Sequence, residues 1–225
     1  IEANIKFKCF DTTCSIGATN ITNGDSILNG AFPQCENGYI IASAEGYETK
    51  KYIASTVDKG SISMVMDRKY NLTLNVLKNN LDLGSDYAII NFVKDNGSLT
   101  VSYPEQKQVE LTEGQYNIKA YIYSNATINL QGSTTEKCVD VPKSGVLGAV
   151  GFTQKKCFTL TIPDQIVSFA ISGGGNQDYY FTETELEGAS GITINAPGFE
   201  IPTTVDKLQS NYNRVETSGL DATFS

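Results

Sequence analysis

The 225-residue sequence contains no histidine and no tryptophan. Histidine is the usual general base at neutral pH and the commonest metal ligand in proteins. Its absence therefore excludes most hydrolase and metalloenzyme mechanisms. Tryptophan is the usual stacking residue in carbohydrate-binding sandwiches, so its absence weakens the case for a sugar-binding platform.

Positive charge is also scarce. The chain has 17 Lys and Arg against 25 Asp and Glu, which gives a net charge of −8 and a pI near 4.6. Its basic runs, such as Arg68-Lys69 and Lys155-Lys156, are too short to bind an anionic membrane surface. An acidic chain of this kind repels phosphate backbones, so we expect no nucleic-acid partner.

Long hydrophobic runs are missing as well. No stretch approaches the ~20 apolar residues that a membrane-spanning helix requires, so we expect no membrane-spanning segment in this chain. The sequence begins at Ile1. This start is consistent with removal of a leader peptide and equally with a segment of a longer protein.

Threonine, asparagine, serine, glycine and tyrosine are abundant, and five cysteines occur without a CxxC or zinc-type spacing. Thiols with no metal-binding pattern are typical of disulfides formed in an oxidising compartment. We therefore expect an extracellular or cell-surface location. Five is an odd number, so one thiol is expected to be free or to pair with another chain.

Two cysteines lie in near-copies of one short segment. Gly132-Ser-Thr-Thr-Glu-Lys-Cys138-Val and Gly151-Phe-Thr-Gln-Lys-Lys-Cys157-Phe carry glycine, threonine, lysine and cysteine at matching offsets. We predict a structural disulfide between Cys138 and Cys157. On the chain-entropy account, a bridge closing a loop of this length contributes about 3 kcal/mol.

The other three cysteines leave one thiol over. Cys9 continues the apolar face of Ile5 and Phe7, which predicts a buried free thiol. Cys14 and Cys35 would then form the second disulfide. An alternative is that one of the three links two subunits covalently. A catalytic cysteine is not expected, because no histidine is present to generate its thiolate.

Residues 1–68 show the alternation and turn signals of five or six short strands. Ile5 and Phe7 alternate with lysines, and Asn-Gly pairs mark turns between apolar runs. The run Ala31–Glu48, with its Gly38-Tyr39 and Gly46-Tyr47 pairs, resembles carboxypeptidase-regulatory-like and PEGA-type domains. That resemblance implies a transthyretin-like β-sandwich over residues 1–68, a spacer or adhesion role and no catalytic residues.

Residues 69–225 are predicted to form a second, larger β-sandwich. Strand-like runs recur every eight to twelve residues from Tyr70 onward, which is typical of sandwiches. The fold class is therefore mainly β, with two tandem antiparallel β-sandwich (Ig/transthyretin-like) domains. The run Lys-Cys157-Phe … Ile-Pro163-Asp-Gln … Ser-Gly-Gly-Gly is similar to secreted archaeal cell-surface proteins, which implies a cell-envelope setting.

The last 65 residues are expected to add short helices. Pro163–Ile171 fits a short helix that would end at Gly173, so a sub-boundary is expected near residue 163. Thr182-Glu-Thr-Glu185 reads as a capping box. Val205, Leu208, Tyr212 and Val215 share one helical face, and Leu220–Phe224 is expected to be a final strand.

Three patterns could carry chemistry. Gly173-Gly174-Gly175 lacks the Gly-Lys-Ser/Thr ending of a phosphate loop and is interpreted as a helix stop. Glu183, Glu185 and Glu187 are the densest carboxylate cluster, but nothing places two of them across a cleft as a glycosidase requires. No calcium-loop spacing occurs. We therefore predict no catalytic, cofactor or metal site.

Tyrosines and sequons give the remaining candidates. Tyr121 and Tyr123 share one face of a strand, where they would suit a sugar platform, a core rim or a subunit contact; Tyr179 and Tyr180 are further candidates for such a platform. Candidate N-glycosylation sites lie at Asn20, Asn71, Asn96 and Asn125.

The sequence as a whole favours a non-enzymatic structural or adhesive cell-surface protein, such as a subunit of a filament or coat. Its expected partners are copies of itself or other surface proteins. The alternatives are a glycan- or protein-binding module of a larger secreted protein and, third, a carboxylate-based enzyme. A strand lent by the C-terminal residues Leu220–Phe224 is one way in which such subunits could join.

Overall fold

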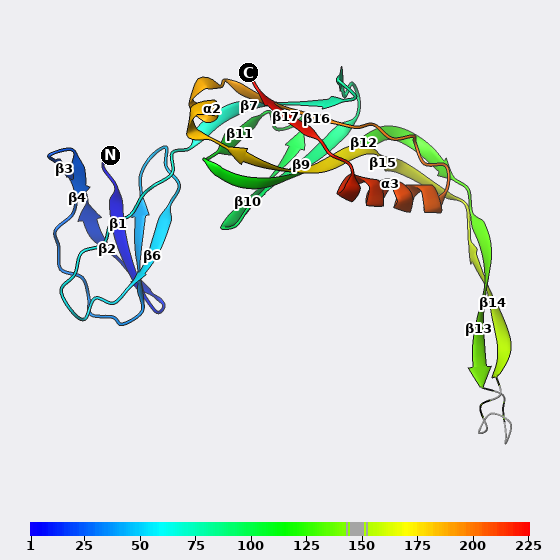
Figure 1. The fold of residues 1–225 in the computed structure, drawn as a ribbon, viewed down its shortest axis with the longest axis horizontal. Helices are drawn as coiled ribbons and strands as arrows, with labels where there is room; N and C mark the ends of the chain where they lie inside the picture. Colours follow the sequence, from blue (N-terminus) through cyan, green and yellow to red (C-terminus); the bar gives the residue numbers. More distant parts are fainter. Residues whose placement is uncertain (143, 145–150, 152) are drawn as a thin grey trace.

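A computed structural model describes residues 1–142, 144, 151 and 153–225 (Figure 1). Of the residues that the structure describes, 59% are in strands and 9% in helices, which confirms the mainly β class with several antiparallel sheets. An N-terminal sheet lies at one end, a two-sheet sandwich follows it, and a thin two-stranded arm extends from the other end of the sandwich (Figure 1).

The N-terminal sheet has the strand order β2-β1-β5-β6, and a separate hairpin joins β3 to β4. The bounds of these strands are β1 Asn4–Cys9, β2 Thr12–Ala18, β3 Asn20–Thr22, β4 Asp25–Ile27, β5 Gly38–Ser43 and β6 Lys50–Ala54. Phe7, which is fully buried, packs edge-on against Phe32 from the connection before β5. Met64 and Met66 cover the same core. The second layer here is therefore irregular chain, whereas the sequence predicted a second sheet.

The sandwich consists of two sheets that share one core. The front sheet has the order β10-β9-β12-β15, and the back sheet has the order β11-β7-β16-β17 with β8 paired to β7. The bounds are β7 Tyr70–Lys78, β8 Leu81–Asp82, β9 Tyr87–Lys94, β10 Gly97–Tyr103, β11 Gln108–Leu111, β12 Gly114–Leu130, β15 Gln165–Phe181, β16 Gly191–Ala196 and β17 Asp221–Phe224. All strand pairs in these two sheets are antiparallel except β7 with β16, which is parallel.

Alternation along the strands builds the sandwich core. The inward residues of β12, Ile118, Ala120 and Ile122, have no exposed surface, and they face Leu72, Leu74 and Val76 of β7 across one cluster. Successive side chains of a strand point to opposite faces, so Lys119, Tyr121 and Tyr123 lie on the outer face. The expected boundary at 68/69 falls between Met66 of the first core and Tyr70 of the second.

Two helices are present in the described residues, α2 Glu183–Gly188 and α3 Val205–Thr217. Thr182 and Glu185 form the predicted capping box at α2. In α3, Val215 is fully buried, Val205 and Leu208 pack against the root of the arm, and Tyr212 contacts Tyr121. The helix lies on β15 and β12 and thus covers one half of the outer face of the front sheet.

The predicted helix over 163–171 is wrong. Residues 165–171 begin β15, and residues 163 and 164 join it to β14, so the sub-boundary expected near residue 163 falls inside one long hairpin. The three glycines that were expected to stop the helix lie inside β15 instead. A Cβ on Gly174 would approach Ala120 O to 2.3 Å, and one on Gly175 would approach Gly219 O to 2.7 Å. Gly174, with φ +143°, is thus in close contact with the backbone of β12, and Gly175 with the chain that follows α3, so both positions require glycine.

The C-terminal strand makes contacts within its own chain that would be lost if it were lent to a neighbour. β17 pairs with β16 inside its own sheet, and Phe224 packs against Tyr179 and Phe181. The predicted final strand is thus present, but it completes the back sheet of the same chain. Among the described residues, no helix is long and apolar enough to cross a membrane.

Candidate functional site

The arm is a two-stranded ribbon formed by β13 Ser133–Pro142 and β14 Thr153–Ile162. It continues the β12–β15 hairpin beyond the sandwich, and the two strands pair in an unbroken register from Ser133↔Ile162 to Pro142↔Thr153. Nearly all of its residues are exposed, so both faces of the ribbon contact solvent. We refer to β13 and β14 together as the ribbon.

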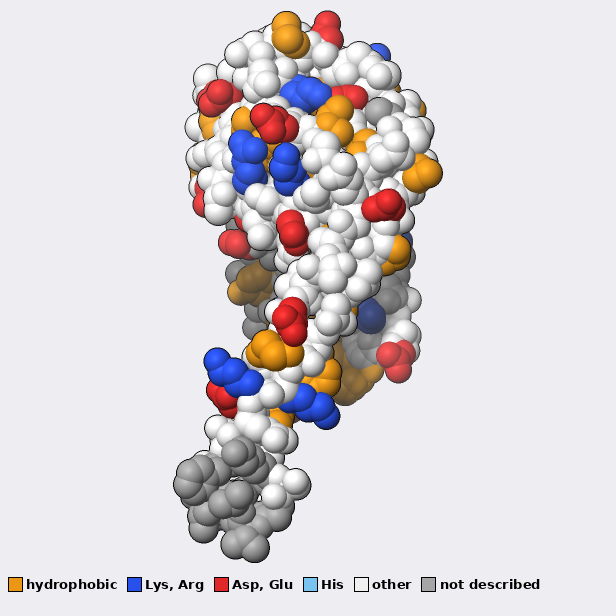
Figure 2. Space-filling model, turned by 90° about the vertical axis from the view of Figure 1, so that its right-hand side faces the viewer, with side chains coloured by type: hydrophobic (Ala, Val, Ile, Leu, Met, Phe, Trp, Pro, Cys, Tyr) orange, Lys and Arg blue, Asp and Glu red, His pale blue; other side chains and the backbone are white. Residues whose placement is uncertain are grey.

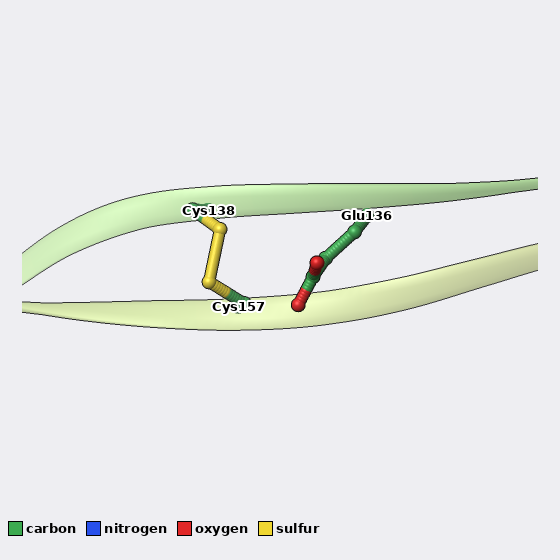
Figure 3. Close-up of side chains that lie close together, drawn as sticks. All are labelled: Glu136, Cys138 and Cys157. Carbon is green, nitrogen blue, oxygen red and sulfur yellow. A yellow bond between two sulfur atoms is a disulfide. The ribbon is translucent and has the colours of Figure 1, made fainter.

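A cross-strand disulfide fixes the register of the ribbon. Cys138 and Cys157 are direct partners, their Cα atoms are 3.9 Å apart and their sulfurs are bonded (Figure 3). This is the pairing that the repeated segments predict; Phe152 of the second copy lies outside the described residues. An isolated two-stranded hairpin is only marginally stable in water, so the covalent bond supplies the stability that a core supplies elsewhere.

Alternation gives the ribbon two unlike faces. The cysteine face carries Glu136, Cys138 and Asp140 of β13, opposite Thr159, Cys157 and Lys155 of β14. The other face, called here the apolar face, is formed by Lys137, Val139, Val141, Lys156, Phe158, Leu160 and Ile162.

The apolar face is exposed and basic. Val139, Phe158 and Leu160 are 49%, 52% and 57% exposed. Lys156 lies over the ring of Phe158 at 5.5 Å, and the face contains no carboxylate. Figure 2 shows hydrophobic and basic side chains together on the described part of the arm. Exposed apolar surface rimmed by charge marks an interaction site.

Glu136, Cys138 and Cys157 form the one group of acidic and cysteine side chains, within the described ranges, that is close enough to share a metal ion. Glu136 reaches from β13 across the ribbon toward β14, beside the disulfide (Figure 3). Metal binding requires thiolates, and here both sulfurs are bonded to each other. In the disulfide form this trio therefore offers a single carboxylate.

The second disulfide joins Cys9 to Cys35, with Cα atoms 6.2 Å apart, and Cys14 is the free cysteine. The predicted Cys14–Cys35 bridge and free Cys9 are therefore wrong. Cys9 does lie beside the N-terminal core, as its alternation predicts, but Cys35 reaches the same core and meets it there. Cys14 lies opposite Phe7 on β2, where its thiol donates to Phe7 O.

The predicted carboxylate cluster is divided among separate partners. Glu183 accepts a hydrogen bond from the Tyr70 hydroxyl, Glu185 accepts from Thr182, and Glu187 forms an ion pair with Arg68. Hydrogen bonds from the backbone and side chain of Thr182 lower the pKa of Glu185. These carboxylates hold α2 in place and do not face one another across a cleft.

The structure does not bring the four candidate tyrosines together. Tyr179 packs against Phe181 and Phe224 and donates to Glu185, while Tyr180 donates to Glu113. Tyr121 and Tyr123 lie on the outer face of the front sheet beside α3. There Tyr121 donates to Glu216 at 3.0 Å, and burial together with this bond raises the pKa of Tyr121.

Lys119 completes a small polar cluster at the end of α3. Its ammonium group lies 2.7 Å from Glu216. The hydrogen bonds from Lys119 and Tyr121 lower the pKa of Glu216. These contacts join α3 to β12. The helix does not extend over β9 and β10, the other two strands of the front sheet.

The four sequon asparagines, Asn20, Asn71, Asn96 and Asn125, are all exposed. Asn96 lies in the turn between β9 and β10, and Asn125 is on β12 close to the root of the arm. Their accessibility is compatible with glycan attachment.

Sequence reasoning missed the apolar face of the ribbon. Its signal is present in the alternation Lys137-x-Val139-x-Val141 and Lys156-x-Phe158-x-Leu160 on either side of the cysteines. Alternation of this kind normally indicates a strand with one face buried. Here nothing in the described residues covers that face.

Comparison of the chain with family models, with curated proteins and with solved structures gives no match. The function of the chain is therefore inferred from its own geometry.

Proposed function

We propose that this chain is a non-enzymatic structural protein of the extracellular surface that joins a neighbouring molecule through its ribbon, as a subunit of a filament or coat. The observation that carries the proposal is the disulfide-bonded ribbon with its exposed apolar, basic face. A two-stranded projection of this kind contributes no core to its own fold. Its apolar residues gain free energy only when another surface covers them.

The remaining features support an extracellular setting. Two disulfides are compatible with an oxidising compartment. The acidic surface and exposed sequons are common in secreted proteins. The cysteine face of the ribbon keeps the strand pair in register, so the apolar face is presented in one fixed arrangement.

Light scattering of the oxidised chain over a range of concentrations tests this proposal. We expect a molar mass that rises above 24.4 kDa with concentration. The double variant Phe158→Glu/Leu160→Glu should abolish the rise, because it places two charges in the apolar face. The matched control is Thr159→Glu/Thr161→Glu, which adds the same charges to the opposite face of the same strand and should assemble like the native chain.

All four substituted side chains are exposed, so folding should be retained, and circular dichroism checks this. A chain that stays at 24.4 kDa at every concentration contradicts the proposal. So does assembly that the Phe158→Glu/Leu160→Glu variant leaves intact.

A further inference from the structure

The front sheet has an uncovered surface next to α3. Because α3 lies on β15 and β12, the outward side chains of β9 and β10 face solvent. Tyr87, Ile89 and Val93 of β9 are 38%, 37% and 44% exposed. We call the outer surface of β9 and β10 the shelf.

Cross-strand pairing places the residues of the shelf in rows. One row contains Ser98, Val93, Asn117 and Asp178, the next contains Thr100, Asn91, Lys119 and Asn176, and the third contains Ser102, Ile89 and Tyr121. The shelf therefore has mostly apolar side chains along β9 and hydroxyl groups along β10, and it is bordered by Tyr121 of β12 and Asp178 of β15.

We infer that the shelf of one molecule is the acceptor for the ribbon of a second copy, so that the subunits join head to tail. This inference rests on the proposed function and names the partner of the ribbon. The apolar face of the ribbon would lie on β9 and β10 beside α3, and would complete the cover that the helix begins.

Size is the first argument. The shelf is two strands wide, which is the width of the ribbon. At about 3.3 Å per residue, the ten-residue strands of the ribbon span about 33 Å and the eight residues of β9 about 27 Å. Sheets that pack face to face lie about 10 Å apart and interdigitate their side chains. The ribbon and the shelf are similar enough in width and length to pack in this way.

Charge is the second argument. Lys137 and Lys156 are the charged residues of the apolar face. Asp178 lies in the same row as Val93, and Asp95 follows β9 in the turn. None of these four makes an ion pair within the part of the chain that the structure describes. The ribbon strands carry a net charge of +1 in a chain of −8, so the rest of the molecule is acidic at −9.

Topology makes this a contact between copies. The ribbon extends away from the sandwich from the ends of β12 and β15 (Figure 1), so it cannot fold back onto its own shelf. The ribbon and the shelf are also different surfaces. An interface between unlike surfaces is heterologous and leaves one of each free at the ends, which generates an open chain of subunits when the rotation does not close a ring.

The contact area sets the expected strength. A ribbon face of about 30 Å by 10 Å buries less than the standard ~800 Å² per partner. We therefore expect a weak contact in dilute solution that strengthens when many copies line one surface. Because lysines meet carboxylates, added salt should weaken it further.

A complementation experiment tests the inference. The ribbon variant Phe158→Glu/Leu160→Glu retains an intact shelf, and the shelf variant Ile89→Glu/Val93→Glu retains an intact ribbon. Each alone should remain at 24.4 kDa, while an equimolar mixture should form a dimer of twice that mass and nothing larger. Ile53→Glu, which charges an exposed residue of the N-terminal sheet, is the matched control and should assemble like the native chain.

The outcomes separate this inference from the proposed function. If the native chain assembles and the ribbon variant does not, but the shelf variant assembles normally, the ribbon has another partner surface and the inference is overturned while the proposed function stands. Self-pairing of ribbons would give this result. If the native chain never assembles, and sediments instead with phosphatidylglycerol vesicles through Phe158 and Leu160, both are overturned.

Discussion

One pair of antiparallel strands occupies two environments in this molecule. Up to Tyr123, β12 pairs with β15 inside the sandwich, and farther along the chain β13 and β14 extend the same hairpin into solvent. Ile122 of β12 has no exposed surface, whereas Leu160 of β14 is 57% exposed. Strand pairing is common to both parts, but only one of them has a core.

The two parts therefore depend on different stabilising forces. The sandwich buries apolar side chains from both sheets, and burial is the dominant favourable contribution to folding. The ribbon replaces that contribution with a covalent bond between paired residues. Stability in the sandwich should respond to core volume, and stability in the ribbon should respond to the disulfide.

Truncation of a side chain in each part gives the largest expected contrast. Ile122→Ala should lower the free energy of unfolding by about 3–4 kcal/mol, because it leaves a cavity in the shared core. Leu160→Ala should change it by less than about 0.5 kcal/mol, as is usual for exposed positions. Urea unfolding of both variants, under conditions where the chain is monomeric, measures the difference. Similar losses in the two variants would show that the ribbon is covered after all.

Removal of each disulfide should affect a core region and the ribbon differently. Cys9→Ser/Cys35→Ser releases a bridge inside the N-terminal core and should cost about 3 kcal/mol in the unfolding of that region. Cys138→Ser/Cys157→Ser should leave the urea midpoint for unfolding of the sandwich unchanged. Its effect should be local, with amide exchange in β13 and β14 about 100-fold faster, which corresponds to the same chain-entropy contribution.

Hydrogen exchange read by mass spectrometry separates these effects. Cys14→Ser serves as the control for cysteine substitution, because Cys14 is outside both bridges. A lower urea midpoint for unfolding of the sandwich in the Cys138→Ser/Cys157→Ser variant would mean that the ribbon folds as one unit with the sandwich.

Loss of a buried polar side chain beside the sandwich should lower the free energy of unfolding by a smaller amount. Asn211 of α3 is buried, and its amide donates to Ile171 O and Glu200 O, both at 2.9 Å. Asn211→Ala should cost about 2 kcal/mol, because two carbonyl groups lose their donor. Ser210→Ala, at the exposed neighbouring position, is the control. Thermal unfolding that is equally insensitive to both substitutions would mean that α3 is not fastened by this amide.

Periodic features of the fold were predictable from the sequence. The strands of both regions, the capping box at Thr182 and the apolar face of α3 all depend on local patterns that the structure retains. The prediction of a helix over 163–171 failed because a short apolar run does not distinguish a helix from a strand. Both spacings fit Ile166, Val167, Phe169 and Ile171. The pairing of β15 with β12 decided it.

Features that depend on distant contacts were not predictable. The choice of Cys9 over Cys14 as the partner of Cys35 depends on how the connection before β5 crosses the N-terminal core. The parallel pair of β7 and β16 joins residues more than a hundred positions apart. At the candidate site, the cysteine pair was visible as a repeat. Its exposure was not visible, because alternation alone does not tell whether a partner layer exists.

The smallest expected effect concerns the polar cluster that fastens α3 beside the shelf. Lys119 and Tyr121 hold the pKa of Glu216 below its ordinary value of 4.5 in the folded chain. A carboxylate with a lowered folded pKa stabilises the fold fully above its ordinary pKa, and this stabilisation is lost as the pH falls through the folded pKa. The exposed pair contributes less than about 1 kcal/mol, because solvent screens it.

Glu216→Gln should therefore reduce the fall in unfolding free energy below pH 4.5, and Lys119→Gln should reduce it similarly. Urea unfolding across this pH range measures both variants, and a native slope in either one would assign the acid sensitivity to other carboxylates.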